Sequence, residues 1–135
     1  MELDYYTFKD DCLNIIEPYL KKYGYAYNAS KSEKFINMYK GENGYVEISM
    51  LSSFPFICVS YTFLILDDKY AKVGLLEKFL GINRKEMRAS YQEFSSRYDD
   101  SVYINQMRYA VEAMEKFYKP ILIGEIELED FADNL

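Results

Sequence analysis

The side chains that could support catalysis in this chain are three pairs of neighbouring carboxylates and one cysteine, Cys58. The pairs are Asp10/Asp11, Asp67/Asp68 and Asp99/Asp100. Two close carboxylates can act as acid and base when burial raises the pKa of one of them. Each pair also lies near the expected start of a helix, where a carboxylate caps free amides and complements the helix dipole. We therefore interpret all three pairs as structural.

Histidine is absent from the 135 residues, which excludes several kinds of active site. Catalytic triads and dyads that use an imidazole base are ruled out, as is an HExxH zinc site. Cys12 and Cys58 are too few for a disulfide framework or a structural zinc site, and we expect both to be reduced and packed in the core. Glycine-rich phosphate-binding motifs are also missing. The sequence thus predicts no enzymatic activity, no metal and no cofactor.

The net charge of −6 is concentrated at the C-terminus. Residues 125–135 contain five acids and no Lys or Arg: Glu125, Glu127, Glu129, Asp130 and Asp133. Removing these five from the 22 acidic residues leaves 17, against 16 Lys and Arg, so the rest of the chain is nearly neutral. Such an acidic field repels nucleic acid and attracts a basic partner.

Two interpretations of this acidic segment are equally weighted. It is either a solvated terminus, as most charge runs are, or an anionic edge that meets a basic protein surface. Ile126, Leu128 and Phe131 lie among the acids and favour the second interpretation slightly, because a purely solvated tail needs no apolar anchors.

Apolar spacing predicts a long N-terminal helix over Asp4–Tyr23. Asp4 is placed to cap its start and Gly24 to end it. Pro18 lies inside the pattern and lacks the amide that a helix requires, so we expect a kink near Asn14–Glu17.

The following region predicts an antiparallel meander of three to four strands. The segments 34–40, 45–51 and 56–66 are extended, and 25–28 is a candidate fourth strand. Residues 41–44 (GENG) form a turn. Both faces of 56–66 are rich in apolar residues, which predicts a central strand that is covered on both sides.

Three helices are predicted after the sheet. They begin near Asp67, Asn83 and Ser101, and the last carries a stripe of apolar side chains that Pro120 should end. Basic residues of the second helix are expected on its solvated face, paired with Glu86 and Glu93: Arg84, Lys85, Arg88 and Arg97. Residues 121–131 fit either a strand or a helix. We favour an edge strand or a short extended segment that packs through Ile126 and Leu128.

The order of elements predicts one α+β domain spanning residues 1–135. No segment has the roughly 18 uninterrupted apolar residues of a membrane helix. The N-terminus is acidic and lacks the basic and apolar regions of a signal peptide. We therefore expect a cytoplasmic protein that binds neither membrane nor nucleic acid.

In general style the chain resembles the small acidic immunity proteins that bacteria encode beside polymorphic or contact-dependent toxins. The resemblance covers most of the chain and rests on the opening helix, the meander around residues 44–48 (GYVEI), the aromatic-rich later helices and the closing stretch 120–125 (PILIGE). It implies a protein that neutralises one cognate toxin by stoichiometric binding, without catalysis. Electrostatic steering would follow if that toxin is basic.

On this hypothesis Glu125, Glu127, Glu129, Asp130 and Asp133 form an anionic rim, and neighbouring tyrosines act as anchors. The alternative is a small-molecule-binding α+β domain. The sequence contains 15 Tyr and 9 Phe, enough to line a pocket with aromatic rings. A deep pocket lined by Tyr61, Phe63 and Tyr109 would favour that alternative.

Overall fold

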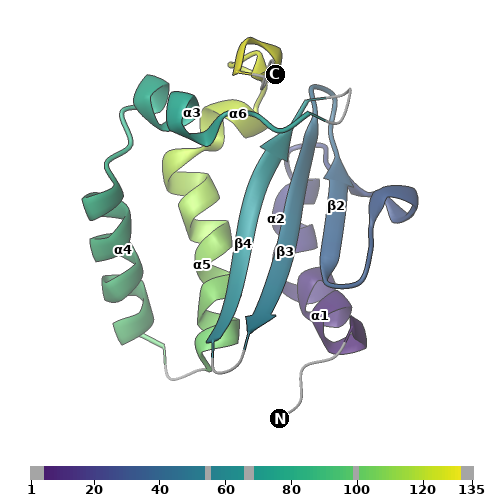
Figure 1. Cartoon of the computed structure of the whole chain (residues 1–135), viewed down its shortest axis with the longest axis vertical. Helices are drawn as coiled ribbons and strands as arrows, with labels where there is room; N and C mark the ends of the chain where they lie inside the picture. Colours follow the sequence, from purple (N-terminus) through teal and green to yellow (C-terminus); the bar gives the residue numbers. More distant parts are fainter. Residues whose placement is uncertain (1–4, 54–55, 66–68, 99–100, 132–135) are drawn as a thin grey trace.

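The computed structural model describes residues 5–53, 56–65, 69–98 and 101–131, and these form the predicted α+β arrangement (Figure 1). An N-terminal helix precedes a four-stranded antiparallel sheet, and further helices follow. The strands pair in chain order: β1 (Ala26–Tyr27), β2 (Ile36–Lys40), β3 (Tyr45–Ser53) and β4 (Phe56–Leu64). The meander is confirmed, including its short first strand.

The N-terminal helix is interrupted where the sequence predicts a kink. It consists of α1 (Tyr5–Asp11), the π-helical turn η1 (Cys12–Ile16) and α2 (Glu17–Lys21). The Glu17 amide donates to the Cys12 carbonyl, five residues back. Pro18 cannot donate to Asn14, and in a regular α-helix its ring would clash with the Asn14 carbonyl. A wider π-turn relieves that clash. The predicted cap, Asp4, lies outside the described residues.

One face of the sheet forms the main core. The alternation predicted for β3 is confirmed, because Val46, Ile48 and Met50 are all buried. Val46 lies opposite Phe63 of β4, and Phe63 is only 3% exposed. This face packs against α5 (Val102–Phe117), whose Met107 and Met114 are fully buried.

The prediction that residues 56–66 form a central strand was wrong, because β4 lies at the edge of the described sheet. On its outer face Leu64 joins Met38 and Tyr45 in a small cluster. Cys58 on the same face is exposed, so its predicted burial was also wrong, whereas Cys12 is buried as expected. The outer face of β4 is therefore covered only at one end of the strand, where Leu64 joins this small cluster.

The edge of β4 is partly covered without a fifth strand. The Val59 amide donates to Oε1 of Gln106 on α5 at 2.7 Å. Farther along, the Ala71 amide donates to the Phe63 carbonyl at 2.9 Å. Unpaired edge groups invite pairing with other chains, and these contacts occupy two of them.

The later helices are α3 (Val73–Leu80), α4 (Arg84–Ser96), α5 and α6 (Lys119–Leu122). The side chain of Asn83 accepts hydrogen bonds from the Lys85 and Glu86 amides, and that of Ser101 accepts one from Ile104, so both predicted caps form. Asp67/Asp68 and Asp99/Asp100 lie outside the described residues.

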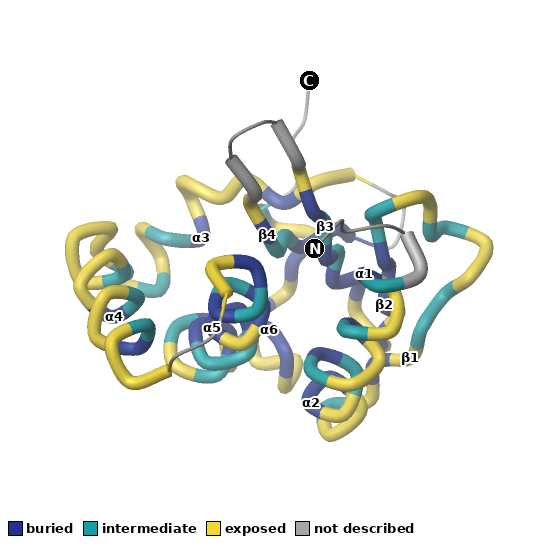
Figure 2. Tube along the Cα trace, turned by 90° about the horizontal axis from the view of Figure 1, so that it is seen from below, coloured by how far each residue is buried: buried dark blue, intermediate teal, exposed yellow. Residues whose placement is uncertain are grey.

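Figure 2 shows α5 between α4 and α2, with α4 largely exposed. Within the described part of the chain, no helix has the length and apolar character needed to span a membrane.

We predict opposite effects for alanine at two glycines. A Cβ at Gly44, in the β2–β3 turn, would overlap the carbonyl oxygen of Leu64, whereas a Cβ at Gly74, in the first turn of α3, would meet nothing within 4 Å. Gly44→Ala should lower the free energy of unfolding by about 1–3 kcal/mol. Gly74→Ala should raise it by up to about 1 kcal/mol, because alanine favours the helix. Urea unfolding of both variants checks this, and equal effects would contradict the packing described for Gly44.

Candidate functional site

The acidic C-terminal segment is not a strand, so the favoured prediction for residues 121–131 was wrong. Helix α5 ends at Phe117, just before Pro120, as predicted, and Pro120 itself lies in the first turn of the short helix α6. Gly124 then adopts a positive φ of 79°, and the chain turns into the short 3-10 helix η3 (Leu128–Phe131). In this turn the side chains of Ile126 and Leu128 are buried, as expected.

The turn presents the acids to solvent. Glu125, Glu127, Glu129 and Asp130 are all exposed. By contrast, Ile126 is 8% exposed and Leu128 is 2% exposed. Asp133 lies outside the described residues. Four of the five predicted site residues are therefore exposed within one short stretch of the chain, and the buried side chains of Ile126 and Leu128 fix that stretch to the core.

Two contacts tie the segment to the body of the protein. The Lys72 amide, just before α3, donates to the Phe131 carbonyl at 2.7 Å. The ring of Phe131 packs edge-on against that of Phe79 on α3, with centroids 5.3 Å apart. In Figure 1 the yellow C-terminal turn lies at the same end of the molecule as α3 and α6. The acids are thus placed beside α3.

An exposed apolar strip on α3 accompanies the acids. Phe79 is 65% exposed and Leu75, one turn earlier, is 47% exposed. The exposed ring that contacts Phe131 of η3 therefore belongs to a phenylalanine, Phe79, and not to one of the tyrosines. The apolar composition of α3 was visible in the sequence, but its nearness to the acids depends on the turn at Gly124. We call Leu75, Phe79 and the four described acids the acidic surface.

The one carboxylate pair that the structure describes, Asp10/Asp11, lies at the end of α1 and does not cap a helix start as predicted. Asp10 is exposed on α1, and Asp11 accepts a hydrogen bond from the Tyr103 hydroxyl at 2.9 Å. Among the residues that the structure describes, no three metal-ligating side chains come together.

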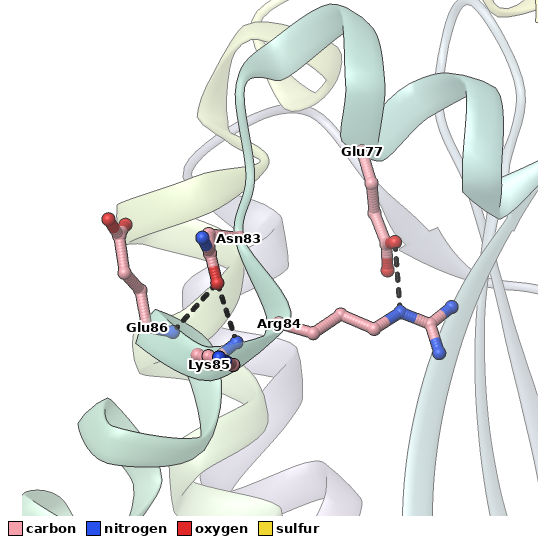
Figure 3. A network of polar contacts seen from close by, with 5 residues as sticks. All are labelled: Glu77, Asn83, Arg84, Lys85 and Glu86. Carbon is pink, nitrogen blue, oxygen red and sulfur yellow. Dashed lines mark hydrogen bonds and ion pairs between the residues drawn. The ribbon is translucent and has the colours of Figure 1, made fainter.

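The basic residues of α4 lie on its solvated side. Arg97 pairs with Glu93, as expected, at 3.5 Å. Arg84 instead pairs with Glu77 of α3 at 3.1 Å, next to the Asn83 cap (Figure 3). The Glu77–Arg84 contact therefore spans the α3–α4 connection, and Figure 3 shows Lys85 and Glu86 contacting Asn83 through their backbone amides.

The rings considered for a ligand pocket pack against other side chains. Tyr61 and Phe63 contact each other and Tyr118, with centroid distances between 5.2 and 6.3 Å. Tyr109 packs against Tyr91 and Phe94. These residues fill the interface between β4, α4 and α5.

A polar cluster that sequence reasoning missed joins α2 to α5. Hydroxyls of Tyr19 and Tyr23 donate to the same oxygen of Glu115 at 2.8 and 2.7 Å. Lys119 pairs with the other carboxylate oxygen at 3.2 Å. These contacts, led by the Tyr23 hydrogen bond, lower the pKa of Glu115 to about 2. Tyr19 and Glu115 are 96 positions apart, so no local pattern could have revealed the cluster.

Comparison with known proteins adds no relative: no family model, curated protein or solved structure matches the chain.

The Glu115 cluster makes a pH-dependent contribution to stability. Because its pKa is lower in the folded than in the unfolded state, the carboxylate stabilises the fold above the unfolded pKa near 4.5, and this contribution is lost as the pH falls towards about 2. Glu115→Gln should therefore be less stable than the native chain near neutral pH, with the difference shrinking below pH about 4.5. Denaturant unfolding across this range tests it. Glu86→Gln, on the exposed face of α4, is the control, and a pH-independent difference for Glu115→Gln would contradict the assignment.

Proposed function

We propose that this chain is an immunity-type protein that neutralises a cognate toxin by stoichiometric binding and performs no catalysis. Its partner is a basic protein, and it meets that partner in the cytoplasm of a bacterial cell. The observation that carries the proposal is the anchored acidic surface. Four exposed acids alternate with buried Ile126 and Leu128, and they lie beside exposed Phe79.

This arrangement has the chemistry of a protein interface. Binding surfaces typically combine a central aromatic or aliphatic anchor with a polar rim, and a few anchors supply most of the affinity. Phe79 and Leu75 supply apolar area that a folded monomer leaves in water at a cost. Buried anchors between the acids reduce the conformational entropy that binding would otherwise remove.

The charge distribution supports a basic partner. The acids of the segment are next to one another, so their fields add and extend over about a Debye length, roughly 10 Å at 0.1 M salt. Such a field accelerates encounter with a positively charged protein and repels nucleic acid. A basic toxin is the class of partner that fits both properties.

The proposal is tested by capture from a lysate of the source organism. The expected result is one partner bound at one-to-one stoichiometry, basic, toxic when expressed alone and harmless when co-expressed with this chain. Capture of nothing, or of a partner without toxicity, contradicts the proposal.

We predict that charge reversal of the rim weakens binding. A triple variant should bind the captured partner at least tenfold more weakly at about 0.05 M salt, mostly through slower association. It carries Glu125→Lys, Glu127→Lys and Glu129→Lys. The difference should shrink at about 0.5 M salt, where the charges are screened. Surface plasmon resonance measures both. A matched control reverses three acids elsewhere, Glu33, Glu86 and Glu93, all exposed. If this control weakens binding equally, net charge rather than the acidic surface is responsible.

Phe79→Ala should separate binding from folding. Phe79 is 65% exposed but packs against Phe131, so its removal should lower the free energy of unfolding by only about 0.5–1.5 kcal/mol and leave the fold intact. Loss of an anchor should weaken the captured complex more than about tenfold. Calorimetry gives the affinity and thermal unfolding the stability. Leu51→Ala, a 67% exposed residue on β3, is the matched control. Equal affinities for Phe79→Ala and Leu51→Ala would show that α3 is not part of the interface.

A further inference from the structure

A small hollow of about 150 Å³ lies between the N-terminal helix and the first two strands, and it shares no residue with the acidic surface. In Figure 2 the N-terminal helix lies beside β1 and β2. Three lining residues follow one another along that helix at steps of three and four positions, which places them on one side of it: Asp10, Leu13 and Glu17. The strands supply the opposite wall of the hollow.

That opposite wall contains a buried acceptor without a partner. Asn37 of β2 lines the hollow and is only 2% exposed. Its Nδ2 donates to the Tyr39 hydroxyl at 3.5 Å, but no donor among the described residues reaches its Oδ1. Native structures satisfy most buried polar atoms, because an unpaired one costs stability. The Oδ1 atom can therefore accept a hydrogen bond from a bound ligand.

Two tyrosine rings stand beside this amide. Tyr27 and Tyr39 are directly opposite each other in the pairing of β1 with β2, and both line the hollow. Their rings meet edge-on with centroids 5.9 Å apart. The Lys9 ammonium lies 5.4 Å from the centre of the Tyr27 ring. Aromatic faces attract cations, and an ammonium group of the chain itself already uses one of these rings in this way.

The charge of the lining is negative. Asp10 and Glu17 both line the hollow, and neither has an ion-pair or hydrogen-bond partner for its carboxylate among the residues that the structure describes. Burial raises the pKa of the Tyr39 hydroxyl, and the negative charge of Glu17 adds to this effect. Lys9 is the one cation of the lining, so two carboxylates face one ammonium there.

We propose that this hollow binds the ammonium group of a small aliphatic amine. An ammonium N–H donates to Oδ1 of Asn37, the positive charge is attracted by Asp10 and Glu17, and the alkyl chain lies against Leu13 and the tyrosine rings. The volume is below the roughly 300 Å³ at which pockets for larger ligands begin, so the amine is short. A calcium ion fits less well, because the rings stand where it would need some of its about six to eight oxygen ligands.

The test compares butylamine with 1-butanol, which has the same chain and a hydrogen-bond donor but no charge. Nuclear magnetic resonance follows the side-chain amide of Asn37 and the methyl groups of Leu13 at pH 7 and constant ionic strength. Butylammonium should shift both signals saturably with one-to-one stoichiometry. Butanol should bind at least about fivefold more weakly, because it lacks the attraction to the carboxylates and rings.

Two variants of the lining should change the affinity in opposite directions. Glu17→Gln removes a carboxylate and should weaken butylammonium binding about two- to fivefold, the range for a partly exposed ionic contact. Lys9→Gln removes the competing cation and should strengthen binding by up to about twofold. Glu86→Gln, on the exposed face of α4 outside the hollow, is the control and should leave the affinity unchanged.

Asn37→Leu tests the acceptor itself. Leucine has a similar size, so this variant should keep the native midpoint of thermal unfolding or exceed it, because a buried oxygen without a partner is removed. Its affinity for butylammonium, followed at Leu13, should fall at least about fivefold. If Asn37→Leu unfolds early, the Glu17 and Lys9 variants decide.

Three results would overturn the proposal, and the toxin-binding surface would be unaffected by any of them. The first is equal affinity for butylammonium and butanol, or no saturable shift with either. The second is a change in the same direction for Glu17→Gln and Lys9→Gln. The third is unchanged amine affinity in a folded Asn37→Leu variant.

Discussion

Burial of one sheet face against α5 is the interaction on which the rest of this structure depends. An antiparallel sheet with one apolar face requires a helical layer over that face. Met107 and Met114 of α5 belong to the same buried cluster as Val46 and Ile48 of β3, and all four are fully excluded from solvent. Because α5 also supplies Gln106 to the edge of β4, the same helix both covers part of the sheet and limits its exposed edge.

Tyrosine hydroxyls attach three helices, α1, α2 and α4, to α5. Tyr19 and Tyr23 hold α2 through Glu115, Tyr103 holds α1 through Asp11, and Tyr109 donates to the Met87 carbonyl of α4. A tyrosine places a large apolar ring in the core and still satisfies a polar group at its margin. This structural use accounts for four of the 15 tyrosines.

Local sequence patterns were sufficient to predict the elements whose structure depends on residues close together in the chain. The apolar stripe of α5, the alternation in β3, the Asn83 and Ser101 caps and the break before Pro18 each depend on residues within a few positions of one another. Two features depend instead on the whole fold. The edge position of β4 follows from what pairs beside it, and the turn of the C-terminal segment follows from where Leu128 packs, close to Gly44. The candidate acids were therefore found from the sequence, whereas Phe79 and the Glu115 cluster were not.

The exposed charges of this fold are positioned by apolar contacts beneath them. The C-terminal acids follow α6, which comes directly after α5, and the Ile126 and Leu128 side chains between them are buried in the main core. On the flanking helices, cations lie over aromatic rings: Lys22 over Tyr19 and Arg97 over Phe94, at 5.4 and 5.6 Å from the ring centres. Such a cation keeps its charge while its aliphatic stem covers apolar area. The helical layer around α5 therefore sets where both kinds of charge lie, although the charged groups themselves remain in solvent.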